Sequence, residues 1–532
     1  MSTSRFLPII VATLFNLSAL YVHADGGMPA WANFFKGIGN SDDQPTAIAL
    51  DKNGGVIVAG YASGASGDYD YATIKYSNAG TALWTNVYAR AGASYPNNID
   101  QINALAVDED GSIYVTGFAT GSNGIPDYVT VKYSEDGVAQ WTNIFNGSGD
   151  GADRAGAIVI GASGSAYVTG YVFSEEGQYD CATIKYSSNG GVLWTNFFNF
   201  PGTNFSSFGK SLALDSNENL YVGGNLNDGD QSRFLTIKYT SLGVPLWTNL
   251  FKTTETGNAD LSSLVVAGDG FAYVAGDVED FSGGARRVAT IKYSPAGATL
   301  WTNFFSSGLN LVAMAKNLAV GPEGCVYLSG ATLTSFESGT DYATVKYAAD
   351  GTPIWTNIFN GLGNDFDDPR ALAVDPAGNV YVTGSSQGNG SDSSFATIKY
   401  ASSGAALWTN LYQGVLNSGS GAVALAVDGL GSVYVTGTAY FGGLGGGFAT
   451  IKYVADTVPL SISLMANFPG PLSCSLSLTG KPNVTYVIQF TTNISSGAWF
   501  PLGTNTTGAN GVFTMVDSSP TNAQRFYRAT SP

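Results

Sequence analysis

Clustered carboxylates are the side chains of this chain that could most directly do chemistry. Three short loops combine acids with Gly or Ser, so that several oxygens would lie close together. Calcium takes about six to eight oxygen ligands, so these loops are candidate calcium sites, although none has the spacing of an EF-hand loop. The alternative is a solvated acidic rim without an ion. The candidate ligands are Asp42, Asp43, Asp150, Asp153, Asp365, Asp367 and Asp368.

The scarcity of histidine restricts the chemistry further. The only histidine, His23, lies in a segment that we expect to be removed. Without it, Ser-His-Asp and Cys-His nucleophilic sites and His-ligated zinc are excluded. Paired carboxylates could hydrolyse a glycosidic bond, but no two acids stand out as partners. The sequence favours a non-enzymatic protein, with a carbohydrate-active enzyme or a purely structural surface protein as alternatives.

The elements that would position these acids belong to an internal repeat. A lysine in a T-[IV]-K-Y segment recurs at intervals of about 54 residues, a period typical of propellers rather than helical solenoids. Seven of the lysines are followed, nine positions later, by tryptophan. The lysines are Lys75, Lys132, Lys185, Lys238, Lys292, Lys346, Lys399 and Lys452, and the tryptophans are Trp84, Trp141, Trp194, Trp247, Trp301, Trp355 and Trp408.

Each repeat predicts four short strands. In the second repeat these are 104–108, 112–117, 127–133 and 139–145, which are rich in β-branched and aromatic residues. Eight such units predict an all-β, eight-bladed β-propeller around a central channel. Trp31 lies in a segment, WANFF, that resembles the fourth strand of a repeat. We expect it to complete the last blade and close the ring, which removes two exposed strand edges.

The repeated lysines and tryptophans are interpreted as structural residues. A third strand lies away from the channel, and both of its faces contact neighbouring blades. A lysine there would bind an adjacent carbonyl or a turn aspartate, and the indole N–H of each tryptophan would need one acceptor. We therefore expect function in the loops instead.

Variable loops gather on one face of the predicted ring, which we call the loop face. It carries the loops that join second and third strands and the loops that enter the inner strands. Aromatic side chains in these loops would suit a glycan or a protein ligand. The candidate ligand-binding residues are Tyr95, Phe173, Phe281, Phe336, Phe366 and Tyr440.

Three regions of the chain are expected to differ in role. Residues 1–24 have a basic end, an apolar run and a small-x-small site, as in a secretory signal peptide. Residues 25–455 form the propeller, and 456–532 form a small C-terminal β-sandwich with many short strands. No later segment predicts a membrane span. We expect a secreted monomer that is extracellular or associated with the cell surface.

The net charge of the chain restricts the kinds of partner that it can bind. The formal charge of −17 lacks the basic footprint that nucleic acid requires, so nucleic acid is not expected as a partner. No cofactor is expected apart from the calcium considered above. Acidity of this kind favours solubility and attracts cations.

The units ALAVDEDGSIYVTG and DYVTVKYSEDGVAQW resemble the secreted bacterial β-propeller repeats of the SBBP type. The resemblance covers about residues 31–453 and rests on spacing and turn motifs. It implies a secreted or surface-attached protein without an assigned activity. The C-terminal region resembles β-modules found on large secreted bacterial proteins, which implies an accessory or attachment role.

Overall fold

The computed structural model describes most of the propeller region and parts of the C-terminal region. The described residues are 27, 29–65, 67–90, 98–200, 205–229, 231–252, 257–280, 285–306, 313–333, 339–388, 392–414, 419–440, 445–454, 461–467, 473–479, 485–491, 500–506, 512–517 and 526–530. The predicted signal peptide and the ligand candidates Tyr95, Phe281 and Phe336 lie outside these ranges.

Strands make up almost all of the regular structure of the described residues. Blade 1 contains β2 (Gln44–Leu50), β3 (Val56–Ser63), β4 (Tyr69–Tyr76) and β5 (Ala82–Tyr88); blade 2 contains β6 (Gln101–Val107), β7 (Ile113–Thr120), β8 (Pro126–Tyr133) and β9 (Ala139–Phe145); blade 3 contains β10 (Arg154–Ile160), β11 (Ala166–Phe173), β12 (Tyr179–Tyr186) and β13 (Val192–Phe198); blade 4 contains β14 (Ser206–Leu214), β15 (Leu220–Asn227), β16 (Ser232–Tyr239) and β17 (Pro245–Phe251). Blade 5 contains β18 (Ala259–Val266), β19 (Ala272–Asp280), β20 (Ala285–Tyr293) and β21 (Thr299–Phe305); blade 6 contains β22 (Ala313–Val320), the 3₁₀ turn η1 (Pro322–Gly324), β23 (Val326–Leu333), β24 (Thr340–Tyr347) and β25 (Pro353–Phe359); blade 7 contains β26 (Asp367–Val374), β27 (Val380–Gln387), β28 (Ser393–Tyr400) and β29 (Ala406–Tyr412); blade 8 contains β30 (Gly421–Val427), β31 (Val433–Tyr440), β32 (Gly446–Tyr453) and β1 (Pro29–Phe35).

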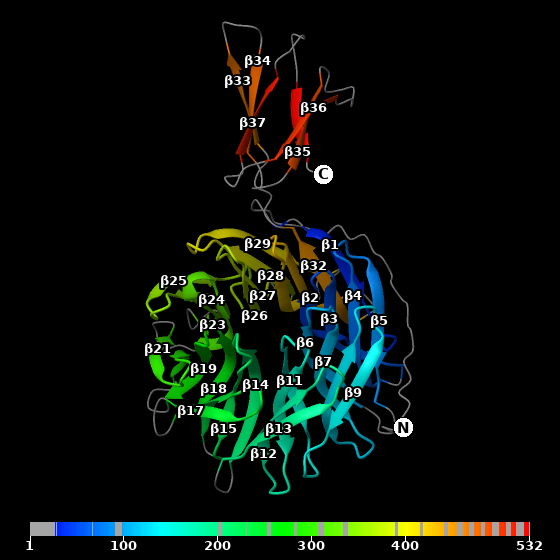
Figure 1. Cartoon of the computed structure of the whole chain (residues 1–532), viewed down its shortest axis with the longest axis vertical. Helices are drawn as coiled ribbons and strands as arrows, with labels where there is room; N and C mark the ends of the chain where they lie inside the picture. Colours follow the sequence, from blue (N-terminus) through cyan, green and yellow to red (C-terminus); the bar gives the residue numbers. More distant parts are fainter. Residues whose placement is uncertain are drawn as a thin grey trace. The chain divides into compact units, whose positions relative to one another are not determined.

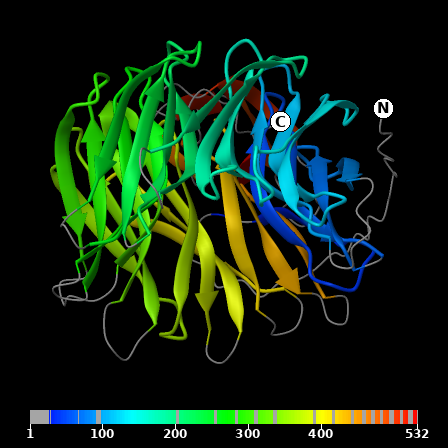
Figure 2. The ribbon, with the colours of Figure 1, turned by 90° about the horizontal axis from the view of Figure 1, so that it is seen from below.

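The strands form eight four-stranded antiparallel sheets around a ring, as Figure 1 shows. Each inner strand contacts the inner strand of the next blade, and β30 contacts β2, so the contacts run around the whole ring. In Figure 2 the strands run between the two faces of the ring, where the loops gather. The prediction of an all-β, eight-bladed propeller is confirmed.

In five blades, the turn between the first and second strands begins with an aspartate, and in four of these a glycine follows three residues later. In blade 1, Oδ1 of Asp51 accepts the N–H groups of Asn53 (2.8 Å) and Gly55 (2.7 Å), and Gly54 has φ of +77°. Glycine adopts this left-handed conformation without a steric penalty. In blade 4 the glycine position holds Glu218, whose φ is +58°. Its carboxylate accepts the N–H of Ala162 in blade 3, which favours glutamate at this strained position.

A three-residue clasp of lysine, tryptophan and asparagine is described at seven of the blade junctions. Trp84 Nε1 and Lys75 Nζ both donate to the carbonyl of Glu135 in the following blade, at 3.0 and 3.1 Å. Asn86 donates to the carbonyl of Gly137 in the same turn, at 2.7 Å. Both structural roles predicted for lysine and tryptophan are confirmed. The carbonyls shared by a lysine and a tryptophan belong to Asn78, Glu135, Ser188, Ser241, Pro295, Ala349 and Ser402.

The last blade takes one strand from near the start of the chain. Strand β1 pairs antiparallel with β32, with Phe34 opposite Ala449. Gly27 has φ of +72°, and its carbonyl accepts the amide of Asn410 at 2.8 Å. This bond matches the one from Asn86 to Gly137 between blades 1 and 2. Residues near the start of the chain thus occupy the turn position that the repeat fills elsewhere.

Residues Val454–Pro532 form a second compact unit. Its strands are β33 (Ser461–Asn467), β34 (Ser473–Thr479), β35 (Thr485–Thr491), β36 (Phe500–Thr506), β37 (Val512–Asp517) and β38 (Phe526–Thr530). They form two three-stranded sheets, β33-β34-β37 and β36-β35-β38. Leu476 and Leu478 of the first sheet are buried in one cluster with Tyr486 and Ile488 of the second. Among the described residues of the whole chain, no helix is long and apolar enough to cross a bilayer.

Blade 1 departs from the other blades beside its turn aspartate. In blade 2 the Asp108 carboxylate accepts the hydroxyl of Tyr114 at 3.0 Å, and Lys132 lies 4.0 Å away. Blade 1 has Ile57 in place of that tyrosine, and Lys75 lies 2.9 Å from Oδ2 of Asp51. Burial acts to raise the pKa of Asp51, but Lys75 and two backbone N–H groups lower it overall. The blade 1 pair is therefore the more closely coupled one.

Lys75→Met should destabilise the protein more than the matched substitution Lys132→Met. Removing Lys75 leaves a buried carboxylate without its cation, which costs about 3 kcal/mol. In blade 2 the tyrosine remains as a partner, so the loss should be about 1 kcal/mol. Urea unfolding at pH 7 measures both values. Equal losses would show that the lysines act only through the clasp.

Candidate functional site

A β-bulge near the loop face interrupts every inner strand. In blade 4 the register between β14 and β15 shifts between Gly209 and Ser211, so that Lys210 is the extra residue. Bulges re-aim side chains and are enriched beside functional sites. Because the repeat fixes the backbone, blades differ here only in the side chain presented. The bulge residues are Thr46, Asn103, Gly156, Lys210, Ser262, Lys316, Arg370 and Val423.

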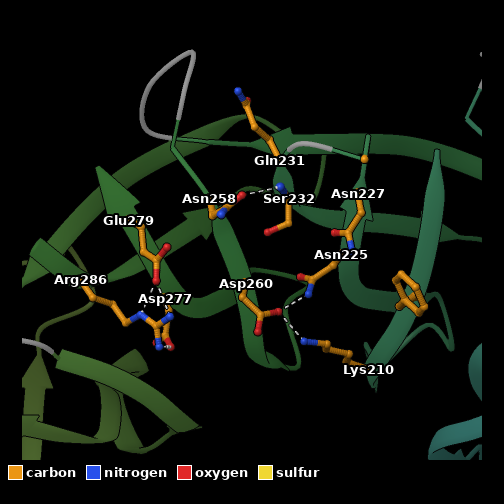
Figure 3. A pocket seen from close by; sticks show the side chains of 12 residues that line it. Lys210, Asn225, Asn227, Gln231, Ser232, Asn258, Asp260, Asp277, Glu279 and Arg286 are labelled. Carbon is orange, nitrogen blue, oxygen red and sulfur yellow. Dashed lines mark hydrogen bonds and ion pairs between the residues drawn. The ribbon is translucent and has the colours of Figure 1, made fainter. Parts of the chain in front are cut away.

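A cavity of about 540 Å³ lies at the loop face between blades 4 and 5. Figure 3 shows that β14, β15, β18 and β19 turn polar side chains toward it. Its volume falls in the range typical of small-molecule sites. Its lining includes Lys210, Asn225, Asn227, Gln231, Asn258, Asp260, Asp277, Glu279 and Arg286.

Ion pairs and hydrogen bonds hold most of these side chains in place. The Asp260 carboxylate accepts from both Lys210 and the amide of Asn225, which joins the two blades. The Arg286 Nε donates to Glu279 at 2.8 Å. Figure 3 draws these contacts as dashed lines. A polar cavity whose side chains are already positioned loses little conformational entropy on binding.

One aspartate of this cavity, Asp277, is a weaker acid than an ordinary aspartate. Asp260 and Asp277 are direct partners across β18 and β19, so their Cα atoms lie about 5 Å apart. Burial raises the pKa of Asp277 to about 6, and the charge of Asp260 adds to this, against the opposing N–H of Ala315 and the charge of Arg286. Asp277 therefore titrates near neutral pH.

The acidic loops predicted as calcium sites contain one buried aspartate each. Oδ1 of Asp43 accepts the N–H of Ser63 at 2.8 Å, and Oδ1 of Asp153 accepts that of Phe173 at 2.7 Å. Asp43, Asp153 and Asp367 also each accept a glycine N–H from the loop before the inner strand. Burial raises the pKa of all three, to about 6 for Asp153. Their carboxylates tie the loops to the blades.

The remaining acids of these loops lie in different settings. Asp42 accepts the hydroxyl of Tyr440 at 2.6 Å, and Asp368 pairs with Lys316 at 3.0 Å and with Arg370 at 2.8 Å. Asp150 is exposed, and Asp365 is half-buried. Within the described parts of the chain, no three His, Cys, Asp or Glu residues are grouped so as to hold a metal ion. Calcium binding stays a prediction.

The described aromatic candidates fall in three separate places. Phe173 packs edge-on against Tyr179, with ring centroids 5.1 Å apart. The ring centroid of Tyr179 lies 5.7 Å from that of Phe208, and Phe208 lines the cavity. Phe366 is 62% exposed, and the Tyr440 hydroxyl is bonded to Asp42. Phe173 thus belongs to the aromatic cluster that supports the cavity, whereas the other two lie on blades 7 and 8.

Sequence reasoning missed the cavity residues, although a signal was present. The second strand of every blade contains a glycine opposite the inner strand, and the residue after this glycine varies. It is aromatic in blades 1–3 and polar in blades 4, 5, 7 and 8. Asn225 and Asp277 hold this position. Variation directly after a fixed glycine indicates a position that the scaffold leaves free.

The comparisons with known proteins identify the repeat. Residues 354–390 match the family model described as SBBP, Beta-propeller repeat, so the resemblance seen in the sequence is confirmed for this segment. A search of curated proteins gave no match.

Solved structures resemble the fold weakly. Polysaccharide lyase Uly1 is 12% identical, with a TM-score of 0.42, 74% of this chain and 99% of that chain covered. A protein of unknown function from Dyadobacter fermentans is 9% identical, with a TM-score of 0.39 and coverages of 81% and 99%. The Synechocystis apocarotenoid oxygenase is 11% identical, with a TM-score of 0.39 and coverages of 74% and 92%. None of these similarities indicates a function for this chain.

Asp277→Asn should change how stability depends on pH. A carboxyl whose pKa is raised in the folded protein contributes stability below about pH 4 and loses it as the pH rises through about 6. Relative to the wild type, the variant should gain about 2 kcal/mol between pH 4 and 7. Urea unfolding at several pH values measures this difference. A constant difference across that range would contradict the assignment.

Proposed function

We propose that the protein is a secreted, non-enzymatic scaffold that binds a glycan at the loop face, in the cavity between blades 4 and 5. The observation that carries the proposal is the polar lining of this cavity, in which Lys210, Asp260 and Asn225 are fixed by one another across the blade junction. Sugars present both hydroxyl donors and acceptors, and amide side chains can serve both. A protein that inserts a polar loop is the other occupant to be tested.

One side chain of the cavity has an unmet hydrogen-bonding capacity. The Oδ1 atom of Asn227 is buried and has no partner among the described residues. A buried polar atom without a partner costs free energy, and a ligand hydroxyl would satisfy it. Asn227 ends β15 beside Asn258 and Gln231, whose amides line the same cavity. These three amides are the groups that we expect to contact sugar hydroxyls.

The proposal includes the architecture that presents the site. Residues 1–24 would direct secretion, strand β1 would close the ring, and the two C-terminal sheets would pack as a small sandwich for attachment. The pairing of β1 with β32 and the shared cluster of Leu476 and Tyr486 support the last two points. A closed ring keeps the blades, and hence the cavity walls, at fixed spacing.

A carbohydrate-active enzyme is the second candidate, and the aspartate pair of the cavity favours it. Glycosidases use a pair of carboxyl groups, one of which has a raised pKa, and Asp277, with its pKa near 6, lies opposite Asp260. Both carboxylates are engaged, however, since Asp260 binds Lys210 and Asp277 accepts the N–H of Ala315 at 2.6 Å. This engagement favours binding over catalysis.

The cleaved protein should bind oligosaccharides on a glycan array, with and without calcium. Asn227→Ala should weaken the binding of the best ligand about 5-fold, because one hydrogen bond contributes about 1 kcal/mol. Gln387→Ala is the matched control, since Gln387 ends β27 at the same position in blade 7. Titration calorimetry measures both affinities. A wild type that binds no glycan, or equal losses in both variants, would overturn the proposal.

The enzyme candidate has its own test. The wild type is incubated with the polysaccharide that contains the bound sugar, and new reducing ends are measured. Hydrolysis that Asp260→Asn abolishes, with glycan binding retained, would replace the scaffold proposal with the enzyme. Under the scaffold proposal no reducing ends appear at any pH between 5 and 8.

Closure by the N-terminal strand predicts equal effects at two blade junctions. Asn410→Ala should destabilise the protein by about 1 kcal/mol, as much as Asn196→Ala, because both amides donate to a turn glycine carbonyl, at 2.8 and 2.7 Å. Thermal unfolding compares the two variants. A silent Asn410→Ala beside a destabilising Asn196→Ala would mean that the first residues do not close the ring.

A further inference from the structure

A second cavity lies beside the first, between blades 2, 3 and 4. It has a volume of about 350 Å³ and shares Phe208 and Lys210 with the cavity of Figure 3. Its other walls come from β6, β7, β10 and β11, which contribute Gln101, Phe118, Arg154 and Tyr171. A single extended ligand could therefore contact both cavities across Phe208.

The second cavity lies at the one bulge that has no side chain. The bulge residue of blade 3 is Gly156, whereas the other blades place a side chain there. A Cβ atom at Gly156 would lie 3.2 Å from the carbonyl oxygen of Gly209 in blade 4. Glycine at this position keeps the space between the inner strands of blades 3 and 4 open.

Arg154 is the group in this cavity that lacks an acceptor. Its Nε–H is buried and donates to no partner among the described residues, and the described part of the chain offers the guanidinium no ion pair. The guanidinium lies over the ring of Phe118, 4.3 Å from the ring centroid. The neighbouring Asp153 binds the N–H of Phe173 instead.

Other polar groups of the cavity are already committed. The Gln101 amide donates to Asn103 at 3.1 Å, and the Asn103 amide donates to the carbonyl of Ala155 at 2.7 Å. Lys210 is paired with Asp260. Arg154 is thus the cation with capacity for a ligand, and its planar fork matches a carboxylate by two parallel hydrogen bonds. Stacking on Phe118 holds the fork in one orientation.

The geometry points to a carboxylate-binding subsite at Arg154, so that the glycan bound at the loop face is an acidic saccharide whose uronate carboxylate pairs with Arg154. The inference rests on the proposed function. The sugar ring lies against the aromatic side chains of Tyr171 and Phe208, whose centroids are 5.2 Å apart, and the next residues of the saccharide extend into the cavity between blades 4 and 5. Aromatic rings pack well against the apolar faces of sugar rings. The Arg154 guanidinium would make the site selective for saccharides that carry a carboxylate.

The experiment compares an acidic and a neutral probe by titration calorimetry. The probes are tetragalacturonate and its carboxyl-reduced, neutral counterpart. The wild-type protein should bind tetragalacturonate at least about 10-fold more tightly, because a hydrogen-bonded charge contributes about 1.5–3 kcal/mol. Arg154→Met should weaken binding of the acidic probe about 10- to 100-fold and change binding of the neutral probe less than about 2-fold. Arg154→Lys, which keeps the charge but loses the fork, should fall between them.

Two further variants keep the result interpretable. Arg287→Met removes another arginine that lies over an aromatic ring, Phe304, at 5.0 Å, and it should leave both affinities unchanged. Gly156→Asn gives blade 3 the bulge residue of blade 2, Asn103, and so fills part of the cavity. It should weaken binding of the acidic probe as much as Arg154→Met does. Thermal unfolding of each variant shows that the fold persists.

The outcomes separate the inference from the proposal beneath it. Equal affinity of the wild type for both probes, or equal losses for both probes in Arg154→Met, overturns the carboxylate subsite while glycan binding stands. A wild type that binds neither probe but binds another glycan on the array overturns the subsite alone. A wild type that binds neither probe and no glycan on the array overturns the proposed function and the subsite together. Acid selectivity that Arg154→Met removes and Arg287→Met retains supports the subsite.

Discussion

The rest of the structure depends on one interaction: a turn carbonyl of one blade accepts hydrogen bonds from two side chains of the preceding blade. Trp84 and Lys75 reach Glu135 from adjacent strands, β5 and β4, so both side chains must point to the same turn. This turn also requires glycine at position 137, because a Cβ atom at Gly137 would lie 2.7 Å from the Trp84 ring. Tryptophan, lysine and turn glycine therefore have to recur together, which explains the regular spacing of the repeat.

This constraint divides each blade into fixed and free positions. The clasp and the alternating core residues are tied to neighbours, and they vary little between repeats. The bulge residue and the residue after the glycine of the second strand lie at the loop face, where no repeat contact specifies them. A rigid scaffold with a few free positions is the usual arrangement for binding surfaces. The two cavities form where free positions of adjacent blades meet.

The sequence predicted the fold well because the fold is carried by local patterns that recur. Strand alternation, turn glycines and the lysine–tryptophan spacing are all visible within one repeat. The site was harder to predict because Lys210 and Asp260 lie in different repeats and meet only across a blade junction. The surroundings of Asp43 and Asp153 could not be predicted for a different reason: a sequence displays their charge but not their burial, nor the backbone N–H groups that bond to their oxygens.

The ion pairs at the loop face indicate where a ligand would bind. In blades 6 and 7, Lys316 and Arg370 both pair with Asp368, so these charges satisfy one another. Lys210 and Asp260 do the same between blades 4 and 5. Such pairs contribute little stability when they are partly exposed, but they fix the shape and polarity of the surface around them. Arg154 differs because its carboxylate is missing from the described part of the chain, and the empty space at Gly156 lies beside it. The cation and the space beside Gly156 coincide at this point of the ring, which is where the carboxylate of the proposed saccharide would lie.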